Sequence, residues 1–342
     1  GAPNLAGPGR SAPLAAAGRR PVGVVPTAAA ASYALPLGGV GWRRRTETDG
    51  TRADGPASAV RSQGRFVYAS PNSPIRRRFY RLRAFCGVMS TPRFGQAVEP
   101  LHRRVDVSEW KSVYVVGDVH GCPAELDRLL DELGVTDDDL VVFVGDLVRK
   151  GPDSKAVVDR VRAADNLLTV RGNNEEKLLR GEKELPALTD DDLGWLSSLP
   201  VAISWTGEGD RSGALVVHGG VDPGDTLDEH TVDDLQNTRS LVPGGSYGDR
   251  PYWWEEYAGP QRVFFGHTVL ARPVEREFAV GLDTGCVYGG ALTAYDWRAD
   301  RFHTVSADES AEERAERKIL DPPFAAAGDS DVAPQAVESD SD

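Results

Sequence analysis

The chain has 342 residues, of which 40% are hydrophobic, and this length and composition are sufficient for a globular domain with a sizeable core. Its net charge of −13 is unevenly distributed: residues 1–105 contain 17 arginines and 4 acidic residues, a net charge of +13, whereas residues 106–342 contain 22 basic and 48 acidic residues, a net charge of −26. So acidic a second part repels nucleic acid phosphates and argues against a stable nucleic acid partner, and three cysteines are too few to predict a disulfide framework.

Lysine is rare in this chain, with six residues, all from Lys111 onward, against 33 arginines. A lysine-poor acidic surface is favoured in a cytosol of molar salt, because hydrated carboxylates hold water and screening removes their mutual repulsion. The sparse cysteines fit a reducing compartment. We therefore predict a cytoplasmic protein from a halophilic archaeon.

Residues 1–88 show no hydrophobic periodicity and are rich in proline, glycine, alanine and arginine, which predicts a disordered or non-native leader. Met89 is the only methionine, so we predict that the natural protein begins there and that residues 89–111 lead into the domain. A twin-arginine export signal beginning at Arg19 and a basic arm for nucleic acid or membrane are alternatives. The uncharged stretch 21–42 is too poor in leucine, isoleucine and phenylalanine to favour a membrane span, so no membrane partner is expected.

From residue 112 the pattern alternates between strand and helix. The periodicity predicts a strand from Val113, a helix at Pro123–Leu133, a strand at Leu140–Val144, a helix at Ser154–Ala163 and a strand at Leu167–Val170. Right-handed crossovers wind such a series into one parallel sheet. Helices are then expected at 175–180 and 190–199, followed by strands at 201–205, 214–217, 262–265, 278–282, 291–295 and 302–305.

The late strands have little helix between them, which predicts a second sheet packed on the first. The expected fold class is therefore α/β, a β-sandwich of two mixed sheets flanked by helices, over a catalytic domain at residues 112–306. The stretch between His218 and His267 is irregular and long enough to form a lid. Residues 307–342 are charged and are predicted to form an acidic flexible tail.

Six oxygen and nitrogen donors follow the apolar runs: Asp118, His120, Asp146, Asn173, His218 and His267. Parallel strands bring their carboxyl ends to one edge of a sheet, so these donors are expected to converge. Asp118 and His120 are two residues apart and can bind one cation from the same side of an extended segment. Asp146 can bridge two cations, and the remaining donors complete a second site.

A single histidine after a strand is more often a surface residue, but the donors occur here together and in order. His102, His230 and His303 have no such neighbours and are interpreted as surface residues. The mixture of carboxylate, imidazole and amide suits manganese, iron, zinc or cobalt better than calcium. Two cations roughly 3.5 to 4 Å apart generate a bridging hydroxide for in-line attack on phosphorus, so we predict two divalent metal ions, with manganese favoured and iron, zinc, cobalt or nickel as alternatives.

Six ordered motifs resemble those of the calcineurin-like metallophosphoesterases: GDVHG at Gly117, GDLVRKGPDS at Gly145, RGNNE at Arg171, VHGG at Val217, FGHT at Phe265 and LDTGCVYGG at Leu282. The most similar branch holds the phosphoprotein phosphatases and the symmetrical diadenosine tetraphosphatases. The resemblance implies a β-sandwich flanked by helices. It also implies that Asp118, His120 and Asp146 hold the first metal, and Asp146, Asn173, His218 and His267 the second.

Two positions depart from the family pattern. Where the family reads GDxVDRG and GNHE, this chain has Arg149 and Asn174 in place of the aspartate and histidine that protonate the leaving group. Both members of that dyad are replaced, which indicates an altered mechanism in which Asp146 and Asn174 are the catalytic residues. Arg149 and Lys150 can bind phosphate oxygens. Arg239 in LQNTRSL resembles a phosphate-binding arginine of the branch, with a surface arginine as the alternative.

These features predict a two-metal phosphoesterase that hydrolyses phosphoanhydride or phosphomonoester bonds. Nucleoside polyphosphates such as diadenosine tetraphosphate are the favoured substrates, because an anhydride expels a stable anion that needs little protonation. The alternatives are a serine/threonine protein phosphatase and a weak or non-catalytic metal-binding regulatory module. The expected partner is thus a phosphorylated small molecule or nucleotide, or else a phosphoprotein.

Overall fold

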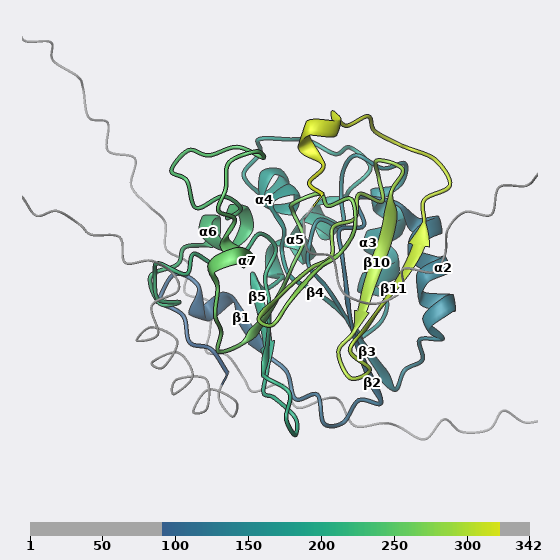
Figure 1. The fold of residues 1–342 in the computed structure, drawn as a ribbon. Helices are drawn as coiled ribbons and strands as arrows, with labels where there is room; N and C mark the ends of the chain where they lie inside the picture. The colour runs from purple at the N-terminus through teal and green to yellow at the C-terminus, as the bar shows by residue number, and fades with distance from the viewer. Residues whose placement is uncertain (1–90, 322–342) are drawn as a thin grey trace, which may run out of the picture. The chain divides into compact units, whose positions relative to one another are not determined.

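The computed structural model describes residues 91–321. The predictions for residues 1–88, including the start at Met89, the export signal and the basic arm, therefore lie outside the described residues. Two β-sheets form the centre of the described part, and helices cover the outer face of each (Figure 1).

The first sheet has five strands in the order β11-β10-β2-β3-β4. These strands are β2 (Ser112–Val116), β3 (Asp139–Phe143), β4 (Leu167–Thr169), β10 (Ala291–Asp296) and β11 (Arg301–Ser306). The strands β2, β3 and β4 are parallel, and β10 runs antiparallel to both β2 and β11. The parallel pairs are joined by α2 (Pro123–Leu133) and α3 (Ser154–Arg162), as the alternating pattern predicts.

The second sheet has six strands in the order β1-β5-β6-β7-β9-β8. These strands are β1 (His102–Arg104), β5 (Ala202–Trp205), β6 (Ala214–Val216), β7 (Arg262–Phe265), β8 (Val274–Arg276) and β9 (Ala279–Gly281). The sheet is mixed, because β6, β7 and β9 are parallel while β5 and β8 run antiparallel to their neighbours β6 and β9. The remaining elements are η1 (Glu99–Leu101), α4 (Asn173–Leu179), α5 (Asp190–Ser198), α6 (Val232–Asn237), α7 (Trp253–Glu256) and η2 (Glu316–Lys318).

Successive side chains of β2 point to opposite faces of the first sheet, and this explains how the sheets and helices pack in layers. Val113 and Val115 point toward the second sheet and pack with Trp205 and Phe264, while Tyr114 and Val116 point to the opposite face and pack with α2 and α3. The outer face of the second sheet packs instead against α6 and α7. In Figure 1 the helix α2 therefore lies at the right of the sandwich, and α6 and α7 lie at the left. The fold class predicted from the sequence is confirmed.

Several details differ from the sequence-based expectation. β10 and β11 belong to the first sheet and not to the second, because β10 pairs with β2. The region between His218 and His267 is not an irregular lid throughout, since it contains α6 and α7. Trp253 and Trp254 of α7 are buried against Phe265, and their burial makes this part of the region a layer of the core.

Two histidines interpreted as surface residues are buried. The side chain of His102 has no exposed area, and its Nε2 lies 2.7 Å from Ser204 Oγ. His230 is 4% exposed, and its Nε2 accepts a hydrogen bond from the backbone N–H of Asp222. Both imidazoles serve as hydrogen-bonding groups in the interior, where buried polar atoms need partners.

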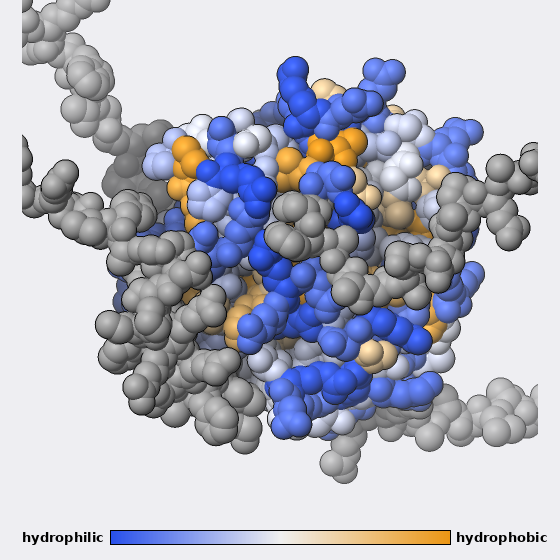
Figure 2. All heavy atoms as spheres, viewed as in Figure 1, coloured by the Kyte–Doolittle hydropathy of each residue, from blue (hydrophilic) through white to orange (hydrophobic). Residues whose placement is uncertain are grey.

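The segment of residues 307–321 contacts the domain. Its Ala307 N–H donates to Gly290 O, and Leu320 N–H donates to Val269 O. The face seen in Figure 2 is dominated by hydrophilic residues, and Val242 is the one large hydrophobic residue that is exposed within 91–321. None of the helices in the same range has the length and apolar character that crossing a bilayer requires.

Candidate metal centre

The six predicted donors lie directly after strands, as the sequence pattern indicates. Asp118 and His120 follow β2, Asp146 follows β3, and Asn173 begins α4 after β4, all in the first sheet; His218 follows β6 and His267 follows β7 in the second sheet. Three of them have positive φ angles: 50° at His120, 54° at Asp146 and 63° at His267. Non-glycine residues seldom adopt this conformation, and such backbone strain gathers at functional sites.

Asp118, His120 and Asp146 form a buried cluster whose potential ligand atoms lie within 4.8 Å of one another. His120 Nε2 is 3.8 Å from Asp118 Oδ2 and 3.5 Å from Asp146 Oδ2. His218 Nε2 approaches the same Asp146 oxygen at 3.4 Å. Asp146 is therefore placed between donors from both sheets, as a residue that bridges two cations must be.

The other two donors stand next to this cluster. The rings of His218 and His267 are 5.2 Å apart between centroids. Asn173 Oδ1 accepts a hydrogen bond of 2.9 Å from Asn174 Nδ2, which also donates to Asp146 Oδ2. The structure thus brings the predicted donors to one edge of the sandwich, and Asn173 reaches Asp146 through the side chain of Asn174.

Two glycines are required for this close approach. A Cβ atom at Gly266 would lie 1.9 Å from Asp118 Oδ1, and one at Gly172 would lie 2.3 Å from Asp146 Oδ1. Any side chain at these positions would displace a carboxylate, because nonbonded heavy atoms do not approach so closely. The turns after β7 and β4 are therefore built to cradle Asp118 and Asp146 respectively.

The imidazoles are oriented for metal binding. His120 Nδ1 is 3.1 Å from Val148 O, and His218 Nδ1 is 2.9 Å from Val144 O. Because a carbonyl oxygen only accepts, each Nδ1 carries the proton, and each Nε2 is directed to the carboxylates. His218 Nε2 has no hydrogen-bond partner of good geometry despite its burial. This is the arrangement of ligating histidines, in which the second nitrogen donates to a carbonyl, so the residues present fit a metal centre.

Burial and neighbouring charges shift the pKa values of the groups in this cluster in different directions. Burial lowers the pKa of His120 to about 3, which keeps this imidazole neutral. Burial works in the same direction at His218, but the Asp146 carboxylate outweighs it and raises the pKa of His218 to about 9. Burial also opposes ionisation of Asp146, yet the positive charge of the His218 imidazole holds the pKa of Asp146 well below its usual range. Asp146 is consequently ionised, which suits a ligand of cations.

Arg149 and Asn174 lie together beside Asp146. Arg149 Nη1 donates to Asn174 Oδ1, and the amide nitrogen of Asn174 donates in turn to Asp146 Oδ2. The backbone N–H of Asn174 donates to Asp146 Oδ1 at 2.8 Å. The two departures from the family pattern therefore form one connected pair, and Asn174 is well placed to orient the Asp146 carboxylate.

Glu175 is a further important residue, although the sequence pattern assigns no role to it. Its fully buried carboxylate accepts hydrogen bonds from the backbone N–H groups of Asp146, Gly172 and Val148. Burial raises the pKa of Glu175 to about 7. Glu175 joins the turn that carries Asp146 to the turn that carries Asn173. Its place in the RGNNE motif is the signal that marks it.

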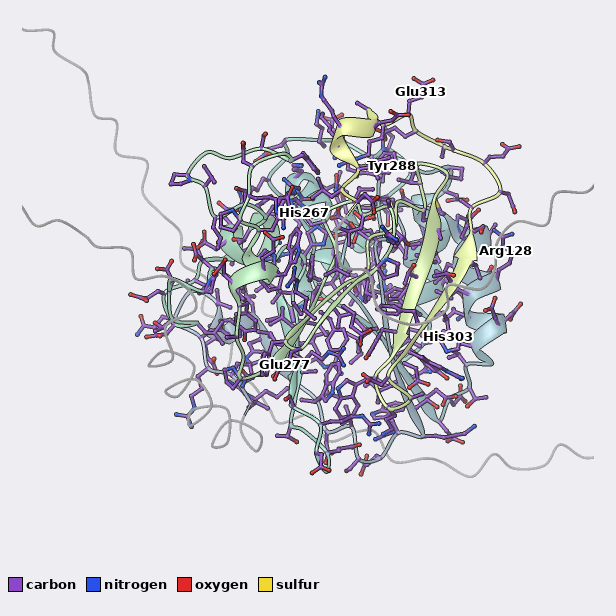
Figure 3. The ribbon with its side chains drawn as sticks, viewed as in Figure 1. Arg128, His267, Glu277, Tyr288, His303 and Glu313 are labelled. Carbon is purple, nitrogen blue, oxygen red and sulfur yellow. The ribbon has the colours of Figure 1, made fainter. Side chains whose placement is uncertain are left out.

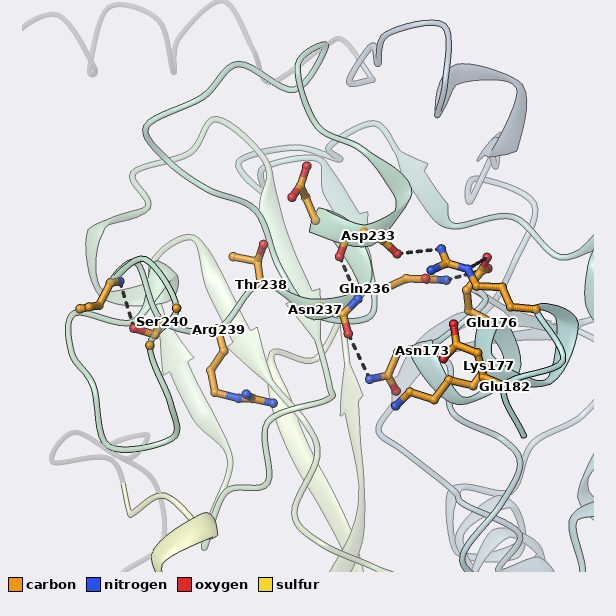
Figure 4. A pocket seen from close by; sticks show the side chains of 15 residues that line it. Asn173, Glu176, Lys177, Glu182, Asp233, Gln236, Asn237, Thr238, Arg239 and Ser240 are labelled. Carbon is orange, nitrogen blue, oxygen red and sulfur yellow. Dashed lines mark hydrogen bonds and ion pairs between the residues drawn. The ribbon is translucent and has the colours of Figure 1, made fainter. Parts of the chain in front are cut away.

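Two of the predicted substrate-binding cations lie at the edge of this centre. Lys150 Nζ is 2.6 Å from His120 Nε2, and Arg239 Nε donates to Thr268 Oγ1 at 2.9 Å. A groove of about 570 Å³ opens beside Asn173 and Arg239, lined by residues of α4, α6 and the loop that follows α6. Figure 4 shows Asn173 and Asn237 hydrogen-bonded across one side of this groove, with Arg239 farther along it.

A two-sheet α/β sandwich with this donor set at one edge is the architecture of a metal-dependent phosphoesterase. The sequence profile of the calcineurin-like phosphoesterase family matches residues 111–305, more than half of the chain, and the protein belongs to this family. Members depend on a dinuclear metal centre, and the chain is accordingly a phosphoric ester or anhydride hydrolase.

Named relatives differ in substrate. The chain is 28% identical over 274 residues to a symmetrical bis(5'-nucleosyl)-tetraphosphatase of Chromohalobacter salexigens, covering 58% of this chain and 99% of the relative. It is 30% identical over 222 residues to serine/threonine-protein phosphatase 1 of Salmonella typhimurium, covering 57% and 96%. A crystal structure named for a candidate diadenosine tetraphosphatase is similar, with a TM-score of 0.52 and 31% identity, over 60% of this chain and 97% of the other.

Proposed function

We propose that this protein hydrolyses nucleoside polyphosphates such as diadenosine tetraphosphate. Asp118, His120 and Asp146 would hold one divalent ion, and Asp146, Asn173, His218 and His267 the other, with manganese as the favoured metal. When bound, two such ions supply a water nucleophile at neutral pH and neutralise the charge of the phosphate.

The pairing of Arg149 with Asn174 is the observation that favours a phosphoanhydride over a phosphoserine substrate. An amide side chain donates a hydrogen bond but cannot transfer a proton, so Asn174 cannot serve as a general acid at pH 7. A serine alkoxide needs such an acid, and a positioned proton donor contributes roughly 10²- to 10⁴-fold to rates of this kind. A nucleotide phosphate leaves as a stable anion, because its second pKa lies near 6 like that of other phosphate monoesters. The lack of a proton donor at position 174 therefore favours phosphoanhydride substrates.

The remaining residues have roles in binding. Lys150 and Arg239 are cations near His120 and Thr268, where they can bind phosphate oxygens. Arg149 holds the Asn174 amide and contributes a further positive charge. Asn174 orients the Asp146 carboxylate through its backbone N–H and its side-chain amide.

Serine/threonine protein phosphatase activity is the second candidate, favoured by the 30% identity with the Salmonella enzyme. The two functions separate when kcat/KM is measured for diadenosine tetraphosphate and for a phosphoserine peptide, with the same added manganese and salt. We expect the tetraphosphate to be the better substrate. A faster reaction with the phosphoserine peptide would replace the first proposal by the second.

A further inference from the structure

Five side chains form a continuous row beside the candidate metal centre: Lys150, Tyr288, Arg314, Tyr247 and Arg239. Cations and tyrosines alternate along this cation–tyrosine row. Lys150 Nζ lies 5.3 Å from the centroid of the Tyr288 ring, and the Arg314 guanidinium lies 4.7 Å from the same centroid. The centroid of the Tyr247 ring lies 5.0 Å from the Arg314 guanidinium and 3.9 Å from the Arg239 guanidinium. Each contact is of the cation–π kind.

Both ends of the row reach residues of the metal centre. Lys150 contacts His120 at 2.6 Å, and Arg239 donates to Thr268, the residue after His267. Figure 3 shows Tyr288 and His267 at the same end of the molecule. Arg314 stands in the middle, one tyrosine away from each of the other cations. Three adjacent cations suit a ligand that carries several phosphate groups better than one that carries a single phosphate group.

Hydrogen bonds fix Arg314 in this position. Its Nη1 donates to Tyr288 Oη at 3.0 Å, its Nη2 to Tyr247 Oη at 2.6 Å, and its Nε to Lys318 O at 3.0 Å. Tyr247 Oη also accepts from Arg239 Nη2 at 3.0 Å. A guanidinium has five N–H groups, so N–H groups of both arginines remain for an anion.

None of the three cations forms an ion pair within residues 91–321, since no carboxylate oxygen lies within 4 Å of any of them. Asp146 and Asp283 are the carboxyls that act on them from farther away. By contrast, the half-buried Arg262 pairs with Glu275 at 2.7 Å and Asp300 at 2.6 Å. Within residues 91–321 these three cations are gathered without a carboxylate partner, in a chain with a net charge of −13, and this favours an anionic ligand.

Arg314 lies outside the part of the chain that matches the family profile, residues 111–305. It belongs to the segment 307–321, which is held by the bond from Leu320 N–H to Val269 O and by the pairing of Arg272 with Asp321 at 2.8 Å. This cation is therefore an addition that the segment brings to a site built by the catalytic domain.

We propose that Arg314 is a specificity-determining residue that binds the phosphates beyond the scissile one in a nucleoside polyphosphate, with Tyr247 and Tyr288 positioning it. This inference rests on the proposed function, because it names the residue that recognises the chain of phosphates. Removal of a hydrogen bond to a charged group lowers affinity by about 10- to 100-fold, so Arg314 is expected to dominate KM for long phosphate chains.

The test compares Arg314→Ala with Arg317→Ala, which removes the same charge from an exposed position of the same segment. KM is measured for diadenosine tetraphosphate and for p-nitrophenyl phosphate, which carries one phosphate. We expect Arg314→Ala to raise KM for the tetraphosphate by about 10- to 100-fold, and by at least tenfold more than for the aryl phosphate. Arg317→Ala should leave both values close to wild type, and Arg314→Lys should recover part of the loss.

A binding measurement separates this inference from the proposed function. Calorimetric titration with inorganic tripolyphosphate should show weaker binding to Arg314→Ala than to the wild type, whereas binding of inorganic phosphate should change far less. Equal effects on both ligands, or none, would overturn the role of Arg314 even if the wild type hydrolyses diadenosine tetraphosphate. A larger loss with phosphoserine peptides would also overturn it. Failure of the wild type to hydrolyse any polyphosphate would refute the proposed function, and the titration would still decide whether Arg314 binds polyphosphate.

Discussion

Replacement of Glu175 by alanine should destabilise the fold and damage the metal centre together. The carboxylate of Glu175 accepts from Asp146 N–H at 2.9 Å, Gly172 N–H at 2.8 Å and Val148 N–H at 3.2 Å. Each buried N–H group that loses its partner costs about 1 to 3 kcal/mol, so the variant should lose at least about 3 kcal/mol of unfolding free energy. For a domain of this size, that loss lowers Tm by about 6 to 12 °C.

Thermal unfolding followed by circular dichroism measures this change, with metal content determined in parallel by elemental analysis. Glu175→Gln is the matched variant: one carbonyl oxygen replaces the two carboxylate oxygens, so at least one of the three hydrogen bonds is lost and an intermediate Tm is expected. Metal content should fall in the same order as Tm, because Glu175 holds the turn of Asp146. An alanine variant that melts within about 2 °C of the wild type would show that these hydrogen bonds do not support the site.

Three other predictions concern the site and one buried histidine. Asp146→Asn should remove nearly all turnover and reduce bound metal while leaving the circular dichroism spectrum intact, because it deletes the carboxylate between His120 and His218. Wild-type turnover with full metal content would contradict the assignment of Asp146 as a metal ligand. Asn174→His combined with Arg149→Asp should raise kcat/KM for phosphoserine peptides more than for diadenosine tetraphosphate, since it supplies a proton donor; a larger gain with the tetraphosphate would speak against the leaving-group reasoning. Burial lowers the pKa of His102 to about 4, so the stabilising effect of its neutral form is complete above pH 6.5 and is lost as the pH falls toward 4, by up to about 3 kcal/mol. His102→Gln should therefore flatten the acid side of a plot of unfolding free energy against pH. An unchanged plot would refute this reasoning.

The strand-end donors could be predicted from the sequence because each depends on a local pattern. Asp118, Asp146 and His218 each follow an apolar run, and the turn after a strand is encoded within a few residues. The sheet to which β10 belongs is not encoded in this way, because its partner β2 lies far away in the chain. β1 and β8 have the sequences HRR and VER, which lack the apolar run that marks the equally short β4, β6 and β9.

The side chains around the donors depend on contacts between distant segments. Arg314 and Tyr247 are 67 residues apart, and neither stands in a recognisable motif. Glu175 is visible in RGNNE, but its three backbone partners are defined only when the turns after β3 and β4 meet. The burial of His102 and His230 likewise follows from packing that no local window of sequence contains.

The proposed ligands come from both layers of the sandwich, with Asp118, His120, Asp146 and Asn173 after strands of the first sheet and His218 and His267 after strands of the second. A cation bound by both sets is a cross-link between the sheets, placed at the seam where the two layers meet. Binding to the native state alone adds about 2.7 kcal/mol of stability at a free metal concentration a hundred times Kd. The concentration of free metal would then determine the stability of the enzyme as well as its rate. Without metal, the two sheets would separate first at the edge that holds the ligands.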